Sequence, residues 1–189
     1  MGKIQDRVVQ WVCFLGIGFF LLWGIEAVLV HNVQNIFDRF FGAFLIWLAW
    51  IWRKELQVTW KTALLGVATL SLHFLKLYGN TYWGIPFDHI MHTAAGFTIA
   101  IFSYNALQRE IKNPWKLALV SVFLAFGITS SIEIVEFFGY HILGSGEGIL
   151  YYGTGDFGEY NNISWDLISN MLGTLIAVVV LHVFRKRKK

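Results

Sequence analysis

Residues 116–141 read KLALVSVFLAFGITSSIEIVEFFGYH, an apolar run that carries two glutamates near its end. As a helix with a rise of about 1.5 Å per residue, this run is long enough to cross a bilayer core about 30 Å thick. Ionised side chains at depth cost about 2.5–3.5 kcal/mol each on insertion scales, and less near an interface. The run therefore predicts a membrane-spanning helix with Glu133 and Glu136 near the membrane boundary. Because charged side chains are costly there, we expect these two glutamates to have a chemical role.

The composition of the whole chain agrees with a membrane protein. Of its 189 residues, 56% are hydrophobic and only 14% are charged, whereas a soluble domain usually carries about 25% charged residues. The two prolines are too few for a disordered chain. The single cysteine, Cys13, excludes a disulfide framework and a cysteine-type zinc site.

Apolar stretches long enough to span a bilayer recur along the chain. We therefore predict an all-α fold, a polytopic transmembrane helical bundle that forms one integral membrane domain over residues 1–189. About six spans are expected, or five if the second stretch is re-entrant. The first is too long for the apolar region of a signal peptide, so we interpret it as a retained span. The predicted spans are residues 8–30, 37–52, 62–79, 88–107, 116–141 and 165–184.

The basic residues predict the orientation of the bundle. With six spans, 13 of the 15 Lys and Arg residues fall on the side that holds both termini. Because Lys and Arg in short loops stay in the cytoplasm, we predict a multi-pass protein of the cell membrane with both termini cytoplasmic. The basic tail, residues 185–189, suits anionic inner-leaflet lipids, and we expect no nucleic-acid partner.

Three predicted spans carry spaced polar pairs close to the same outer membrane face. Residues three or four apart share one face of a helix, so each pair points to one side. Gly96 and Gly173 extend two of these faces and allow a neighbouring helix to approach closely. Helix caps, snorkelling glutamates and a hydrogen bond between helices are the structural alternatives. The pairs are Asp88 with His92, Glu133 with Glu136, and Asp166 with Asn170.

Together these pairs predict one polar pocket that opens outward. The first and third spans add Glu26, His31, His73 and Lys76 at similar heights. Intramembrane ionisable residues are functional candidates by default. The Gly- and Tyr-rich loop at residues 142–164 is interpreted as a lid over this pocket or as a plain connection, because loops of this length are usually functional or mobile.

The order of these motifs resembles that of a known membrane-protein family. Asp-x3-His-x3-Gly, Glu-x2-Glu-Phe and Asp-x3-Asn-x2-Gly occur in that order over residues 85–178. This order resembles the VanZ-like proteins, and more closely their relatives of the YjdF type, in which an acidic, glycine-rich loop precedes a final helix that begins Trp-Asp. The resemblance implies a small helical bundle in a bacterial or archaeal plasma membrane. VanZ-like proteins tend to have Gln where this chain has Glu136, so the site here is more acidic.

The mixed carboxylate and imidazole set favours a metal-dependent enzyme that acts on a lipid or lipid-linked substrate. Such donors hold Zn, Mn, Fe or Mg according to geometry, and a bound metal activates water. The alternatives are a non-catalytic factor that binds a lipid headgroup or a partner, and a small proton- or cation-coupled transporter; a homo-oligomer is compatible with each. We assign Asp88, His92, Glu133 and Asp166 as metal ligands, Glu136 as the general base, and Asn170 as a donor to the substrate or a ligand.

Overall fold

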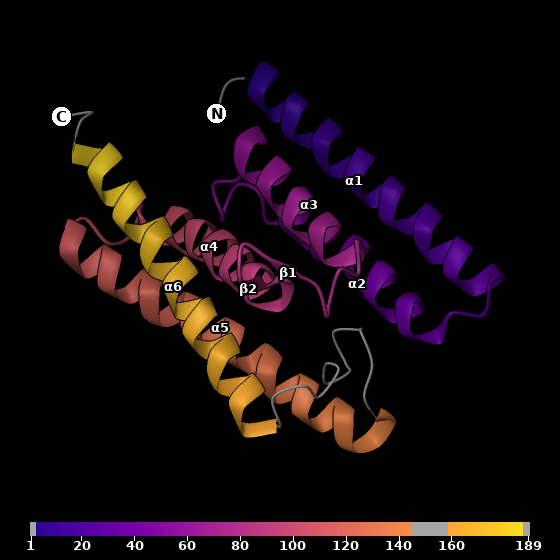
Figure 1. Ribbon diagram of the computed structural model, residues 1–189. Helices are drawn as coiled ribbons and strands as arrows, with labels where there is room; N and C mark the ends of the chain where they lie inside the picture. The colour runs from indigo at the N-terminus through magenta and orange to yellow at the C-terminus, as the bar shows by residue number, and fades with distance from the viewer. Residues whose placement is uncertain (1–2, 145–158, 187–189) are drawn as a thin grey trace.

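The computed structural model describes residues 3–144 and 159–186, and 82% of the chain is helical. The described residues form six helices and one short hairpin (Figure 1). The predicted lid lies mostly at residues 145–158, outside the described residues. The helices are α1 (Lys3–Leu29), α2 (Val33–Ile51), α3 (Trp60–Phe74), α4 (Phe87–Leu107), α5 (Pro114–Leu143) and α6 (Glu159–Lys186).

Local sequence signals set several of these boundaries. The side chain of Thr59 caps α3 in a reciprocal capping box with Thr62, an arrangement that satisfies two free backbone donors. Asn113 caps α5, and Pro114 occupies its first turn, where proline lacks no needed donor. The sixth helix begins at Glu159, six residues before the predicted start at residue 165. Ser164 therefore lies inside α6.

The third predicted span ends earlier in the structure than in the sequence analysis. Helix α3 stops at Phe74, whereas the apolar stretch continues to residue 79. Lys76 has a φ of 49°, which a continuous helix excludes. A hairpin follows, with strands β1 (Thr81–Tyr82) and β2 (Ile85–Pro86) paired antiparallel. Trp83 and Gly84 have φ values of 53° and 80°, as a type I′ turn requires at both central positions.

The helices pack as two groups of three (Figure 1). In one group, α1, α2 and α3 enclose an apolar core that includes Phe20, Ile46 and Phe74. In the other, α4, α5 and α6 pack on small residues such as Ala100, Ala125 and Ala177. Contacts between α3 and α4 join the groups. They include a 2.7 Å hydrogen bond between the hydroxyls of Thr69 and Thr98.

Helices α4 and α6 approach each other most closely through two glycines. An added Cβ at Gly96 would lie 2.2 Å from the carbonyl oxygen of Asn170. One at Gly173 would lie 1.9 Å from the carbonyl oxygen of Thr93. The structure thus confirms that these glycines permit close helix contact. This contact brings the polar residues of α6 against those of α4.

The number of membrane crossings stays a prediction. Among the described residues, α1, α5 and α6 are long and apolar enough to cross a membrane. Helix α3 has 15 residues and reaches only about 22 Å at 1.5 Å per residue. Helices α2 and α4 carry charged residues, which lower their apolar character. The six predicted segments thus coincide with six helices, but six crossings are not established.

Different polar contacts lie at the two ends of the bundle. The start of α1 and the end of α6 lie at the same end of the molecule (Figure 1). At the α1 end, Asp6 bonds Arg53 of the α2–α3 turn at 3.0 Å. In the same turn, the side chain of Gln57 donates to the Asn105 carbonyl of α4 at 2.6 Å. Other polar groups, described below, lie at the opposite ends of these helices.

One of those groups is the ion pair between Glu26 and Arg39, for which we expect a small energetic effect. Arg39 also donates to the Trp23 carbonyl at 2.7 Å and lies over the Trp23 ring. The Glu26 side chain is 54% exposed, and exposed pairs contribute only about 0–1 kcal/mol. Glu26→Gln should therefore lower the unfolding free energy by at most about 1 kcal/mol. Thermal unfolding beside the exposed Glu55→Gln variant tests this, and a much larger loss would contradict it.

Candidate functional site

A cavity of about 460 Å³ lies between the two helix groups. Its volume is within the range of about 300–1,000 Å³ that is usual for small-molecule sites. Apolar side chains of α2, α3, α4 and α5, among them Phe41, Leu70 and Phe102, line much of it. Polar residues gather in another part of the lining. Those with ionisable or amide side chains are His73, Tyr78, Asp88, His92, Glu133, Glu136, Asn162, Asp166 and Asn170.

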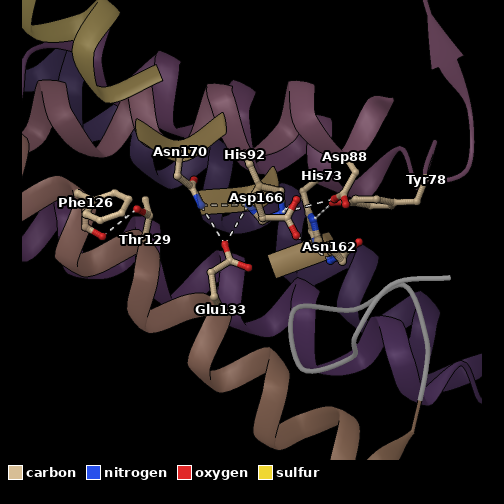
Figure 2. Close-up of polar contacts among 10 residues, drawn as sticks. All are labelled: His73, Tyr78, Asp88, His92, Phe126, Thr129, Glu133, Asn162, Asp166 and Asn170. Carbon is tan, nitrogen blue, oxygen red and sulfur yellow. Dashed lines mark hydrogen bonds and ion pairs between the residues drawn. The ribbon is translucent and has the colours of Figure 1, made fainter. Parts of the chain in front are cut away.

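The imidazole of His92 lies at the centre of the acidic residues (Figure 2). Its Nε2 atom is 3.4 Å from Asp88 Oδ1 and 3.5 Å from Asp166 Oδ1. Its Nδ1 atom is 3.1 Å from Glu133 Oε1 on α5. One side chain of α4 thus contacts carboxylates from three helices, and each ring nitrogen faces a different set.

Two asparagines of α6 complete this arrangement. The Asn170 amide donates to Glu133 Oε1 at 2.9 Å, and its nitrogen is 3.2 Å from His92 Nδ1. One turn before Asp166, Asn162 donates to Asp166 Oδ2 at 2.7 Å. The opposite oxygen, Asp166 Oδ1, is buried and has no hydrogen-bond partner within the described part of the chain. Asn170 Oδ1 is likewise buried and has no hydrogen-bond partner among the described residues.

Two groups of potential metal donors share His92. In the first, donor atoms of Asp88, His92 and Asp166 lie within 4.8 Å of one another. In the second, the donors are His92, Glu133 and Glu136, within the same limit. Because a neutral imidazole binds a metal through one nitrogen and donates from the other, the two groups are alternatives at a single His92.

A second polar chain borders the cavity from the α3 side. Asp38 of α2 is buried and contacts both Lys76 and His73 through Oδ2, at 2.6 and 3.0 Å. His73 Nδ1 lies 2.5 Å from the Tyr78 hydroxyl. His73 and Tyr78 both line the cavity, and Figure 2 shows the Tyr78 hydroxyl pointing toward the acidic residues. Cavity-lining polar groups therefore come from both helix groups.

The comparisons with known proteins identify a family. The family model described as "Predicted membrane protein (DUF2238)" matches residues 9–187. The chain belongs to this family. In the searches of curated proteins and of solved structures, nothing matches the chain. The match to DUF2238 places the chain in a family of predicted membrane proteins. The description of that family names no reaction.

In this DUF2238 protein, the six residues assigned from the sequence all line one cavity. Their roles as ligands, base and donor stay predictions. Of the additional polar residues expected at similar heights, His73 lines the cavity and Lys76 reaches it indirectly through Asp38. Glu26 instead pairs with Arg39, and His31 is exposed; neither lines the cavity. The six assigned residues are Asp88, His92, Glu133, Glu136, Asp166 and Asn170.

The sequence analysis missed three residues that belong to this DUF2238 site or support it. Asn162 lies four residues before Asp166, a spacing that places both on one helix face. Its signal was hidden because residues 159–164 were assigned to a loop. Asp38 was visible as an acid in an apolar stretch. Tyr78 gave no signal, because its position depends on where α3 ends.

Proposed function

We propose that the protein is a divalent-metal-dependent membrane enzyme that hydrolyses a phosphate ester of a lipid or lipid-linked substrate. The observation that carries this proposal is the buried Asp166 Oδ1, which accepts no hydrogen bond from the described residues and lies beside Asp88, 3.5 Å from His92 Nε2. Leaving a buried acceptor unsatisfied costs about 1–3 kcal/mol, and more for a charged group. Four carboxylates around a single imidazole also repel one another, and a divalent cation relieves both penalties.

The hydrogen bonds favour Asp88, His92 and Asp166 as the ligand group. Glu133 Oε1 already accepts from Asn170 and lies within reach of His92 Nδ1. If Nδ1 carries the proton, Glu133 holds the imidazole with Nε2 directed toward Asp88 and Asp166. Carboxylate–histidine–metal arrangements of this kind orient the ligand and raise its basicity. Glu133, which the sequence analysis assigned as a ligand, would then accept a hydrogen bond from His92 Nδ1 and would not contact the metal.

The remaining polar residues suit hydrolysis. A metal held by Asp88, His92 and Asp166 would supply a water of lowered pKa. In the proposed hydrolysis a water oxygen would add to phosphorus while the ester P–O bond breaks and the alkoxide leaves. Glu136 takes the proton from the water and returns it to the departing alkoxide. Asn170, with its free Oδ1 acceptor, positions the water or the substrate.

The apolar part of the cavity supports a substrate with a hydrocarbon chain. Phe41, Leu70 and Phe102 would contact that chain, while its head group reaches the carboxylates. A membrane protein meets such amphiphiles in the bilayer that surrounds it. Mn, Fe, Zn and Mg all accept a donor set of one imidazole and two carboxylates. A measurement of metal content therefore has to identify the metal.

We further propose the finer family relationship and the topology. The motif order over residues 85–178 supports the likeness to VanZ-like and YjdF-type proteins, with Glu136 in place of the Gln usual in VanZ-like chains. The first turn of α1 and the last turn of α6 lie at one end of the bundle, which supports both termini on one side of the membrane. The Lys and Arg residues of that side support the cytoplasm. The acidic cavity would then open outward.

Metal content tests the proposal directly. Protein purified in mild detergent without chelator should carry about one equivalent of divalent metal, since one His92 serves one site. Asp88→Asn and Asp166→Asn should lose that metal while they remain folded. Glu133→Gln should bind metal about 10–100-fold more weakly, as expected for a supporting residue. Mass spectrometry of the metal, with Glu26→Gln as a folding control, gives the answer.

A non-catalytic role is the second candidate, because hydrogen bonds join the helices at the same place. The Thr174 hydroxyl contacts the Gly96 carbonyl at 3.3 Å, and Asn170 links α6 to α5. On this alternative the cluster mainly fixes helix packing or binds a lipid headgroup. Wild-type protein without metal after attempted reconstitution, together with Asp166→Asn protein of lowered melting temperature, would favour it and reject the enzyme.

A further inference from the structure

The Tyr78 hydroxyl is held by a buried hydrogen-bonded chain that the proposed hydrolysis does not use. The chain runs from Lys76 to Asp38, from Asp38 to His73, and from His73 to Tyr78. These contacts measure 2.6, 3.0 and 2.5 Å. Asp38 is 3% exposed, so its carboxylate is shielded from water. The Tyr78 oxygen is therefore fixed at the edge of the cavity.

The partners determine where the hydrogens lie. An ionised carboxylate only accepts hydrogen bonds, so His73 Nε2 must carry a hydrogen toward Asp38. In the imidazole tautomer that carries its hydrogen on Nε2, the other ring nitrogen, Nδ1, is an acceptor. His73 Nδ1 then accepts a hydrogen bond, and the Tyr78 hydroxyl donates to it. With its hydrogen committed to His73, the Tyr78 oxygen presents only lone pairs to the cavity.

The surrounding segment holds the phenol ring in this position. Tyr78 packs edge-on against Phe87 at the start of α4, with ring centroids 5.4 Å apart. Lys76, two residues earlier, has a φ of 49°, a conformation that side chains with a Cβ rarely adopt. Strained residues of this kind persist where the surrounding structure requires them, and they cluster at functional sites.

The cavity therefore offers its ligand many acceptors and few donors. Neither Lys nor Arg is among the described residues that line it. On the proposed function a metal satisfies the carboxylates, whereas the uncharged Tyr78 oxygen can accept a hydrogen bond from a neutral donor. A hydroxyl group supplies one, whereas an ammonium group would be drawn to the carboxylates. We infer that Tyr78 binds a hydroxyl of the head group, so that the substrate is a lipid phosphodiester with a hydroxylated head, such as a glycerophosphate.

This inference rests on the proposed function, since the phosphate needs the metal, and the experiment separates the two. Manganese-loaded protein in amphipol is titrated calorimetrically with hexyl glycerophosphate and with hexyl methyl phosphate. Both probes are diesters with one negative charge and the same chain, and they differ in the hydroxyls. We expect wild type to prefer the glycerol ester about tenfold, the value of one hydrogen bond of about 1.4 kcal/mol.

Tyr78→Phe removes only the hydroxyl and should abolish this preference while it keeps its metal. Tyr82→Phe is the matched control, because Tyr82 packs on the same Phe87 ring and is not in the cavity lining; it should keep the preference. The ratio of the two affinities is a readout that a general loss of stability does not change. Thermal unfolding of both variants confirms that each is folded.

Other outcomes overturn the inference in recognisable ways. Equal binding of the two probes by wild type, or a preference that survives in Tyr78→Phe, shows that Tyr78 does not recognise the hydroxyl. Loss of metal in Tyr78→Phe shows that the residue serves the metal site instead. Metal-loaded wild type that binds neither probe rejects this substrate class and leaves the metal site intact. Wild type that takes up no metal rejects the proposed function and this inference with it.

Discussion

Replacing Gly173 with alanine is expected to separate α4 from α6 and to destabilise the protein by at least about 3 kcal/mol, the upper end of the usual cost of overpacking. The added Cβ would lie 1.9 Å from the Thr93 carbonyl oxygen and 2.9 Å from the Phe97 backbone nitrogen. Both neighbours are backbone atoms of α4, so no side chain can rotate away. The helices themselves must move apart.

The site should be lost together with the packing. Asp166 and Asn170 are on the same helix as Gly173, and their distances to His92 of 3.5 and 3.2 Å depend on close contact with α4. We therefore expect Gly173→Ala to bind metal poorly even at a temperature where it remains folded. Thermal unfolding and metal analysis of one preparation measure both effects.

Gly127→Ala is the matched control for this substitution. Gly127 lies within α5, and an added Cβ there would meet nothing within 4 Å. Removing a glycine from a helix interior is worth about 0.5–1 kcal/mol, so this variant should be slightly more stable than wild type. If Gly173→Ala melted as Gly127→Ala does, the close approach of α4 and α6 would be contradicted.

The helices could be predicted from the sequence because apolar residues form long continuous stretches along the chain. The apolar stretches at residues 88–107 and 116–141 lie within α4 and α5 and miss at most two residues at either end. Boundaries failed where the chain leaves the apolar pattern. Residues 159–164 are mostly polar, yet they form the first turns of α6. The apolar residues after Phe74 are not helical.

The grouping of the site residues was predictable for a related reason. Spacing places Asp88 and His92 on one helix face, and the common height of three such pairs suggests that they meet. Height and spacing give no information about which helix faces which. Asp38 and His73 are 35 residues apart, and only the folded chain shows that they share a hydrogen bond. Likewise, the sequence could not indicate which nitrogen of His92 lies near Glu133, and the proposed supporting role of Glu133 depends on that contact.

Replacing Glu136 with glutamine is expected to leave the metal in place and to lower hydrolysis of a lipid phosphodiester by at least about 100-fold. General-base catalysis contributes about 10²–10⁴-fold, and a glutamine amide cannot take the proton from water. Glu136 lines the cavity one helical turn from Glu133 and is outside the donor group of Asp88, His92 and Asp166. The substitution should therefore remove the base without removing a ligand.

Initial rates with a chromogenic alkyl p-nitrophenyl phosphate, measured on manganese-loaded protein, test this expectation. The value of kcat should fall in Glu136→Gln while KM and metal content stay near those of wild type. Glu133→Gln should behave differently: its metal affinity falls, and saturating manganese restores most of the rate. If Glu136→Gln instead loses its metal, the cation binds among His92, Glu133 and Glu136, because only that donor group contains the substituted residue. If it keeps both metal and rate, another group takes the proton, and the base assigned from the sequence is wrong.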